Sequence, residues 1–120
     1  MLTLAKFVVA VVALLHLWFL VLEMFLWTKP LGRRVFRTTP EFAAASSTLA
    51  ANQGLYNGFL AAGLLWGLAR GDGGRQVMLF FLVCVGIGGM FGAATVNRRI
   101  LYVQALPAAL GIVLLWLGRL

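Results

Sequence analysis

Long apolar stretches dominate the chain, and short polar or basic segments separate them. The apolar stretches cover about residues 4–27, 42–69, 76–96 and 100–117. A helix needs about 20 mostly apolar residues to cross the hydrocarbon core of a bilayer, and each stretch reaches or approaches that length. The pattern therefore predicts an all-α fold, an integral membrane four-helix bundle, with residues 1–120 forming a single transmembrane domain.

The first apolar stretch has a competing interpretation, because a secretory signal peptide also places an apolar run near the N-terminus. Its apolar core, residues 7–22, is long for a signal peptide, and no small-x-small cleavage site follows it. We therefore expect the stretch to remain in the protein as a spanning helix.

The connections between the stretches carry turn and helix-start signals. Residues 28–39 are expected to form a basic loop, and the sequence Thr39, Pro40, Glu41 then predicts the start of a helix. Threonine is a good N-cap, proline fits the first helical position, and glutamate is favourable at the positive end of the helix dipole. Residues 70–75, which are rich in glycine, predict a tight turn with positive-φ positions.

Small residues and one proline shape the predicted helices. Gly54 and Gly58, and likewise Gly88 and Gly92, have the four-residue spacing that lets membrane helices approach closely. Pro107 lies inside the last stretch, where its missing N–H should kink the helix and free a carbonyl. These features predict close helix packing.

Composition and charge narrow the class of partner. The chain is 62% hydrophobic and 11% charged, whereas a soluble domain is typically about 25% charged. Ten Lys and Arg against three acids give a net charge of +7, but the cations lie between apolar stretches without the aromatic interleaving of nucleic-acid grooves. We therefore expect phospholipid contacts and no nucleic acid. The single Cys84 excludes an intramolecular disulfide and a CxxC pair.

The distribution of Lys and Arg predicts an orientation. If the four helices alternate in direction, six cations share the side of loop 28–39, and four, including Arg119, share the side of the termini. The positive-inside rule then places loop 28–39 in the cytoplasm and both termini outside.

Polar residues gather near the end of the predicted helices that adjoins loop 28–39. Glu23 is the acid expected inside an apolar stretch, and His16 lies two turns before it on the same face. A carboxylate costs about 2.5–3.5 kcal/mol at the bilayer centre and less near an interface, so it normally faces protein or a cavity. We therefore predict a one-sided polar pocket around Glu23.

The remaining members of this predicted pocket are hydrogen-bonding side chains of the other helices. The full set of expected ligand contacts is Glu23, His16, Asn52, Gln53, Tyr56, Asn57, Thr95 and Gln104. Arginines of the adjoining connections should form a basic rim, which consists of Arg33, Arg34, Arg37, Arg98 and Arg99. With one histidine and no cysteine cluster, the sequence predicts no metal site and no cofactor.

Four blocks of the sequence are similar to a known family. The blocks are Glu23–Thr28, Asn52–Ala62, Gly92–Thr95 and Gln104–Ala108, and their order agrees as well. On these blocks the chain resembles the small bacterial four-span membrane proteins grouped as domain of unknown function 1304. The resemblance covers nearly the whole chain. It implies a four-helix protein of the bacterial cytoplasmic membrane and no particular activity.

Three functions fit the pattern. The favoured one is binding or transport of a small molecule, with Glu23 as a proton- or cation-coupled carboxylate in a homo-oligomer, because four helices rarely enclose a full pathway. The second is a structural or accessory subunit in which the amides lock the bundle through interhelical hydrogen bonds. The third is an intramembrane enzyme acting on a lipid or isoprenoid, with Glu23 and His16 as acid and base. The sequence favours this enzyme least of the three functions. Expected partners are the lipid bilayer and a small-molecule or lipid ligand.

Overall fold

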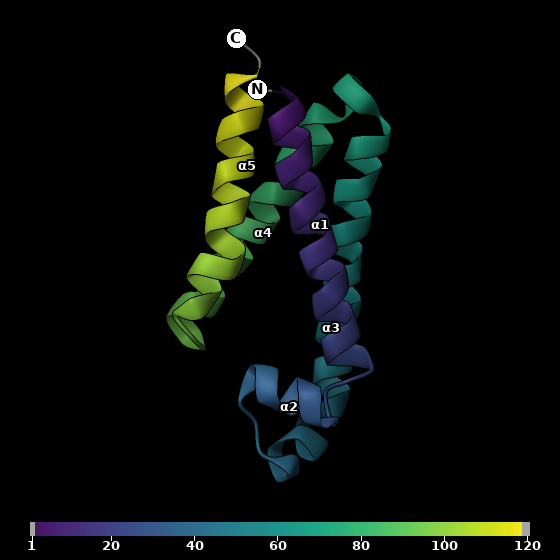
Figure 1. Ribbon diagram of the computed structural model, residues 1–120, viewed down its shortest axis with the longest axis vertical. Coiled ribbons are helices and arrows are strands. Elements are labelled where there is room, and N and C mark those ends of the chain that lie inside the picture. The colour runs from purple at the N-terminus through teal and green to yellow at the C-terminus, as the bar shows by residue number, and fades with distance from the viewer. Residues whose placement is uncertain (1, 119–120) are drawn as a thin grey trace. The chain divides into compact units, whose positions relative to one another are not determined.

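A computed structural model describes residues 2–118 of the protein, and every regular element in that range is helical (Figure 1). The elements are α1 (Leu2–Met24), α2 (Pro30–Phe36), α3 (Pro40–Ala69), the 3₁₀ turn η1 (Gly71–Gly74), α4 (Arg75–Thr95), the π-helical turn η2 (Leu101–Ala105) and α5 (Leu106–Leu117). The all-α prediction is confirmed. Arg119, which entered the charge count, lies outside the described residues.

Residues 2–118 contain five α-helices, so the predicted number of four is wrong. The additional helix is α2, which occupies the middle of the segment 28–39 that was expected to be a loop. Pro30 starts α2 with the fixed φ that suits a first helical position. Arg37 ends it in the left-handed conformation, with a φ of 57°, and donates its N–H to Arg33 O.

Two of the described helices are long and apolar enough to cross a membrane. They are Leu2–Met24 and Gly71–Thr95, judged by length and composition. The last apolar helix, Leu101–Leu117, is shorter. Helix α3 is the longest of the described helices, and the polar side chains in its middle lower its hydropathy.

The described residues form two compact units. The first unit comprises residues 2–13 together with 60–118, and the second unit comprises Leu14–Phe59. Each unit contains part of α1 and part of α3, because the divisions fall inside these two helices.

The first unit has an apolar core in which α4 packs against α5 and η2. Its fully or almost fully buried residues are Ala5, Val9, Val12, Ala13, Leu64, Met78, Leu82, Val85, Ala108, Leu114 and Leu115. Glycine allows the closest approach: a Cβ on Gly74 would lie 1.8 Å from the carbonyl oxygen of Gly67, and a Cβ on Gly89 would lie 2.8 Å from Ala105 N. Substitution of Gly74 by any larger residue would therefore require the backbone to move.

The predicted tight turn between α3 and α4 is present as η1. Gly71 has a φ of +61°, which is the positive-φ conformation expected in this glycine-rich segment. Asp72 in the turn accepts a hydrogen bond from Lys6 Nζ at 3.0 Å, which forms an exposed ion pair with the first turns of α1.

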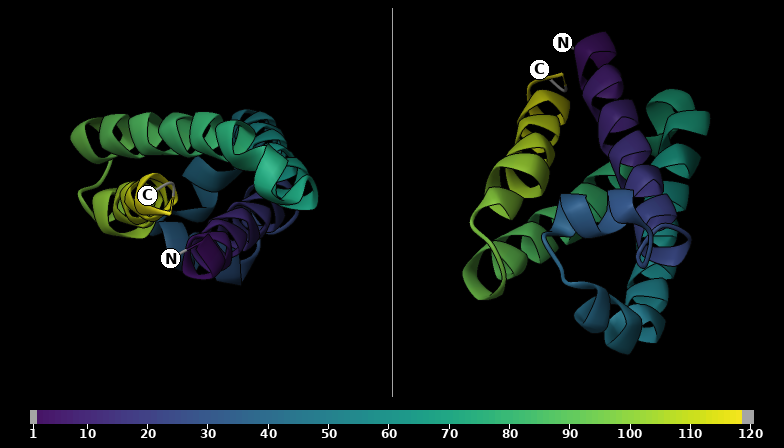
Figure 2. Two further views of the ribbon diagram at one scale, coloured as in Figure 1. Left: turned by 90° about the horizontal axis from the view of Figure 1, so that it is seen from above. Right: turned by 60° about the horizontal axis from the view of Figure 1, so that its bottom comes forward.

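In the second unit, α2 lies crosswise to α1 (Figures 1 and 2). Gly32 of α2 packs against the segment that follows α1, because a Cβ at Gly32 would lie 1.9 Å from the carbonyl oxygen of Leu26. The Trp27 ring packs 4.9 Å from the Phe36 ring, and its indole Nε1 donates to Ser46 Oγ at 3.0 Å. The contacts at Leu26 and Trp27 join α2 to the segment 25–29, and the hydrogen bond to Ser46 joins the same segment to α3.

The predicted helix start at residue 39 agrees with the structure. Thr39 Oγ1 accepts a hydrogen bond from the backbone N–H of Phe42 at 3.1 Å, and the helix begins at Pro40. This contact satisfies one of the backbone donors that a helix leaves without partners at its N-terminus.

Candidate functional site

Glu23 lies in the last turn of α1 and is partly buried. Burial along this helix recurs at Val9, Val12 and His16, at spacings of three and four residues, and Glu23 follows His16 by seven residues. This spacing places Glu23 on the same side of α1 as the buried positions. The carboxylate therefore belongs to the packed side of the helix.

Asn57 of α3 contacts Glu23 directly. Its Nδ2–H donates to Glu23 Oε1, although the two residues are 34 positions apart in the sequence. Asn57 is 8% exposed, so the amide that holds the carboxylate is nearly excluded from the surface. The sequence had placed both residues in the pocket, and the structure brings them together inside the second unit.

A glycine on α3 makes this hydrogen bond possible. A Cβ on Gly54 would lie 3.0 Å from Glu23 Cβ and 2.7 Å from Met24 Cγ, so the two helices approach closely at this level. Gly58 has a similar role, since a Cβ there would lie 2.6 Å from Leu20 Cδ1. The close approach expected from the Gly54-to-Gly58 spacing is therefore observed, and it brings the short side chain of Asn57 within reach of Glu23.

His16 is 1% exposed. Its ring packs edge-on against Phe19, with centroids 5.3 Å apart and an interplanar angle of 72°. The histidine is therefore an interior residue of the second unit rather than a group open to the surface.

The other three members of the predicted pocket on α3 are exposed. They are Asn52, Gln53 and Tyr56. Asn52 Nδ2 donates to Thr48 O in its own helix at 3.1 Å, and the Tyr56 ring lies 6.0 Å from the Phe59 ring. These three side chains thus lie on the surface of α3, whereas Asn57 is buried beside Glu23. Ligand binding by the three exposed side chains stays a prediction.

Thr95 and Gln104 belong to the first unit. Thr95 is exposed and its Oγ1–H donates to Phe91 O at 2.7 Å within α4. Gln104 is partly buried, and its Nε2–H donates to Val85 O at 3.1 Å, so it joins η2 to α4. Both side chains therefore make structural hydrogen bonds inside this unit, and a part for them in binding also stays a prediction.

A π-helical turn comes just before Pro107, and the kink expected at this proline stays a prediction. Leu101–Ala105 form a π-helical turn, in which the Leu106 N–H donates to Leu101 O, five residues back. Pro107 follows directly and supplies no N–H. Such turns commonly occur where a helix accommodates an altered hydrogen-bond pattern.

The arginines of the predicted rim are divided between the two units. Arg98 and Arg99 are exposed in the first unit, just before η2. Arg34 and Arg37 are exposed and Arg33 is partly buried in the second unit, where all three belong to α2 or to its C-terminal end.

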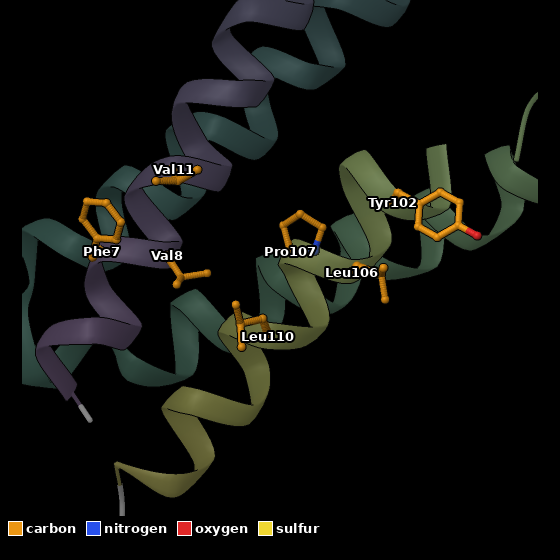
Figure 3. Close-up of a pocket in the computed structure, with 7 residues that line it drawn as sticks. All are labelled: Phe7, Val8, Val11, Tyr102, Leu106, Pro107 and Leu110. Atoms are coloured by element: carbon orange, nitrogen blue, oxygen red, sulfur yellow. The ribbon is translucent and has the colours of Figure 1, made fainter. Parts of the chain in front are cut away.

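An apolar groove lies in the first unit (Figure 3). It has a volume of about 470 Å³ and is lined by Phe7, Val8, Val11, Tyr102, Leu106, Pro107 and Leu110. These side chains come from α1 on one side and from η2 and α5 on the other. The groove contains none of the predicted site residues. Sequence reasoning missed it because its lining is apolar and lacks any distinctive residue type.

Comparisons with known proteins give a family and a relative without an assigned activity. The family model described as protein of unknown function (DUF1304) matches residues 10–116. The chain is 29% identical over 104 residues to the uncharacterized protein YpaA of Lactococcus lactis subsp. lactis (strain IL1403), which covers 85% of this chain and 87% of the relative. No solved structure matches the chain.

Proposed function

We propose that this chain, which belongs to the family of proteins of unknown function DUF1304, is a small integral membrane protein that binds or transports a small molecule at Glu23. The membrane part of the proposal is supported by the two helices Leu2–Met24 and Gly71–Thr95 and by a composition that is 62% hydrophobic. A membrane-embedded carboxylate is costly, so its presence favours a role in ligand or ion binding.

The observation that carries the proposal is the hydrogen bond between Asn57 and Glu23. Asn57 occupies Glu23 Oε1, which fixes the orientation of the carboxyl group, while the Glu23 side chain stays partly exposed. A carboxyl group that is held in place and still accessible can exchange its proton for a cation. The ligand class that fits best is therefore a cationic or protonatable small molecule.

Exchange of the Glu23 proton for a cationic ligand leaves the net charge of the site unchanged. When Glu23 carries a proton, the side chain is neutral, and binding of a cationic ligand releases that proton and forms a neutral pair of carboxylate and cation. Both states avoid an unpaired charge in a medium of low dielectric constant. Coupling between ligand and proton follows from this exchange.

A structural role is the second candidate, and the same hydrogen bond supports it. The bond joins α1 to α3 at the level where Gly54 brings the two helices together. Amide side chains that bond across membrane helices stabilise them by roughly 1 kcal/mol. In this candidate, Glu23 serves as an acceptor for Asn57 and binds nothing else.

We do not propose an intramembrane enzyme. His16, which would have to serve as the base beside Glu23, is 1% exposed and packs against Phe19. A substrate could not reach that ring without opening the helix packing.

The test compares native mass spectra of the wild type and Glu23→Gln, purified in mild detergent. The glutamine side chain keeps the carbonyl oxygen that accepts from Asn57 and loses the ability to pair with a cation. We expect a small-molecule adduct in the wild type that is lost in Glu23→Gln. The matched control is Glu41→Gln, since Glu41 is an exposed acid in the first turn of α3 and its replacement should leave the adduct in place.

If no adduct occurs in the wild type and Asn57→Ala, which removes the hydrogen bond to Glu23, destabilises the protein, the structural candidate replaces the binding proposal. If the protein leaves the membrane fraction on extraction with alkaline carbonate, the membrane part of the proposal is wrong.

A further inference from the structure

Helix α2 begins close to the point where α1 ends. Helix α1 has 23 residues and is therefore about 34 Å long, close to the ~30 Å thickness of the hydrocarbon core. If α1 spans the membrane, as proposed above, Met24 lies near its surface. Trp27, a residue type common at that depth, follows, and its indole donates to Ser46. The short segment 25–29 then leads directly into α2, so α2 lies at the level of the lipid headgroups.

One side of α2 faces the protein. Gly32 is buried against the carbonyl oxygen of Leu26, and Phe36 packs its ring 4.9 Å from that of Trp27. Because successive residues are about 100° apart around a helix, Gly32 and Phe36 share one side. Of the residues outside this side, Leu31, Arg34 and Val35 are exposed and can contact the surroundings.

The rest of α2 is divided into an apolar strip and a basic arc. Leu31 and Val35 lie one turn apart and are 40% and 39% exposed. Arg33 and Arg34 follow on the other side at about 100° per residue, and Arg34 and the C-terminal Arg37 are exposed. An exposed apolar strip beside a basic arc is typical of helices that lie in the plane of the membrane interface. The crosswise direction of α2 relative to α1 agrees with that placement (Figures 1 and 2).

Charge identifies the lipid. The segment 24–40 contains no acid and has four cations, which are Lys29, Arg33, Arg34 and Arg37. A cluster of four to eight Lys and Arg next to a membrane helix binds anionic lipid headgroups. We propose that α2 is an interfacial helix that binds anionic phospholipids, with Leu31 and Val35 at the acyl boundary and Arg34 and Arg37 at the phosphates. The proposal rests on the membrane placement above and is independent of ligand binding at Glu23.

The orientation of α2 can be tested by spin-label depth measurements on the full chain. Single cysteines would replace Leu31, Val35 or Arg34 in a Cys84→Ser background, in vesicles of phosphatidylcholine and phosphatidylglycerol. Labels at Leu31 and Val35 should collide more with oxygen, and a label at Arg34 more with a water-soluble nickel complex.

If labels at Leu31 and Val35 are as accessible to the nickel complex as the label at Arg34, α2 does not lie in the interface and this inference is wrong. The membrane proposal would be unaffected, because it is tested by extraction with carbonate. If alkaline carbonate removes the protein from the membrane fraction, both the membrane proposal and the interfacial placement of α2 are wrong.

Lipid selectivity gives a second, independent test. Arg34→Gln/Arg37→Gln should lower the retention of phosphatidylglycerol relative to phosphatidylcholine in native mass spectra by about fivefold per arginine. The control, Arg98→Gln/Arg99→Gln, removes the same charge from two exposed arginines elsewhere and should change the ratio much less. If both variants lose phosphatidylglycerol equally, the attraction is unspecific and the proposal is wrong. If Arg34→Gln/Arg37→Gln retains as much phosphatidylglycerol as the wild type, the proposal is also wrong.

Discussion

The hydrogen bond between Asn57 and Glu23 predicts a measurable coupling between α1 and α3. Replacing Asn57 by alanine removes the Nδ2–H donor and leaves a partly buried carboxyl group without it. Hydrogen bonds to charged groups contribute about 1.5–3 kcal/mol in water-soluble proteins, whereas interhelical hydrogen bonds in a membrane protein average about 0.6 kcal/mol and reach about 1.7 kcal/mol. Since the Asn57 amide is 8% exposed, we place Asn57→Ala near the upper end of the membrane range, at about 1.5 kcal/mol of destabilisation.

The assay is reversible unfolding in mixed micelles with increasing sodium dodecyl sulfate, followed by tryptophan fluorescence. Glu23→Ala, Asn57→Ala and the double variant form a double-mutant cycle, and we expect a coupling free energy of about 1 kcal/mol. Glu23→Gln should cost less than about 0.5 kcal/mol, because its carbonyl oxygen still accepts from Asn57.

Asn52→Ala is the matched control for this cycle. Asn52 is also an amide of α3, but it is exposed and donates to Thr48 O in its own helix. Its replacement should change the free energy of unfolding by less than about 0.5 kcal/mol. A coupling free energy near zero, or an Asn57→Ala variant as stable as Asn52→Ala, would refute the role that we assign to this hydrogen bond.

Three further substitutions test the packing around the two units. Gly54→Ala should destabilise the protein by about 1–3 kcal/mol in the same micelle assay, because its Cβ would lie 3.0 Å from Glu23 Cβ, and unchanged stability would contradict the close helix contact. Thr39→Ala should cost about 1 kcal/mol and speed hydrogen exchange at the Phe42 amide, while equal exchange rates would argue against the cap. Asp72→Asn should cost at most about 0.5 kcal/mol, because the ion pair with Lys6 is exposed to water, and a larger loss would point to burial of this turn.

The long helices could be predicted from the sequence because their apolar stretches are much longer than a helical turn. The start of α3 was predicted correctly at Thr39, since cap, proline and acid occur in the order that a helix start requires. The resemblance to the family of proteins of unknown function is also confirmed. The number of membrane spans stays a prediction, because length and composition identify two candidate helices.

Helix α2 was missed because seven residues are too few to show a helical periodicity. Two local signals could have identified it: Pro30 suits a first helical position, and Leu31 and Val35 are spaced by one helical turn. The end of α2 gave no such signal, because the left-handed residue there is Arg37 and not a glycine or asparagine.

The predicted order of the helices placed Glu23 and Asn57 in one pocket, but it identified neither their hydrogen bond nor the exposure of the other amides. At about 100° per residue, the polar positions of α3 spread over too wide an arc to face one neighbour. The buried side is set by Ala50, Gly54, Asn57 and Ala61, so Asn57 falls inside it and Asn52 falls opposite. Which side a helix buries depends on where small residues meet the neighbouring helix, and the sequence does not define that neighbour.

The glycine contacts at Gly32 and Gly74 have a consequence for how this chain can vary. At both positions the atom that a Cβ would meet is a backbone carbonyl oxygen, at 1.9 Å and 1.8 Å, and so no rotamer change of a neighbour can make room. In a saturation library selected for expression alone, these two codons should be among the most depleted. Invariance at Gly32 or Gly74 would therefore record a steric limit of the backbone and would reveal nothing about the ligand.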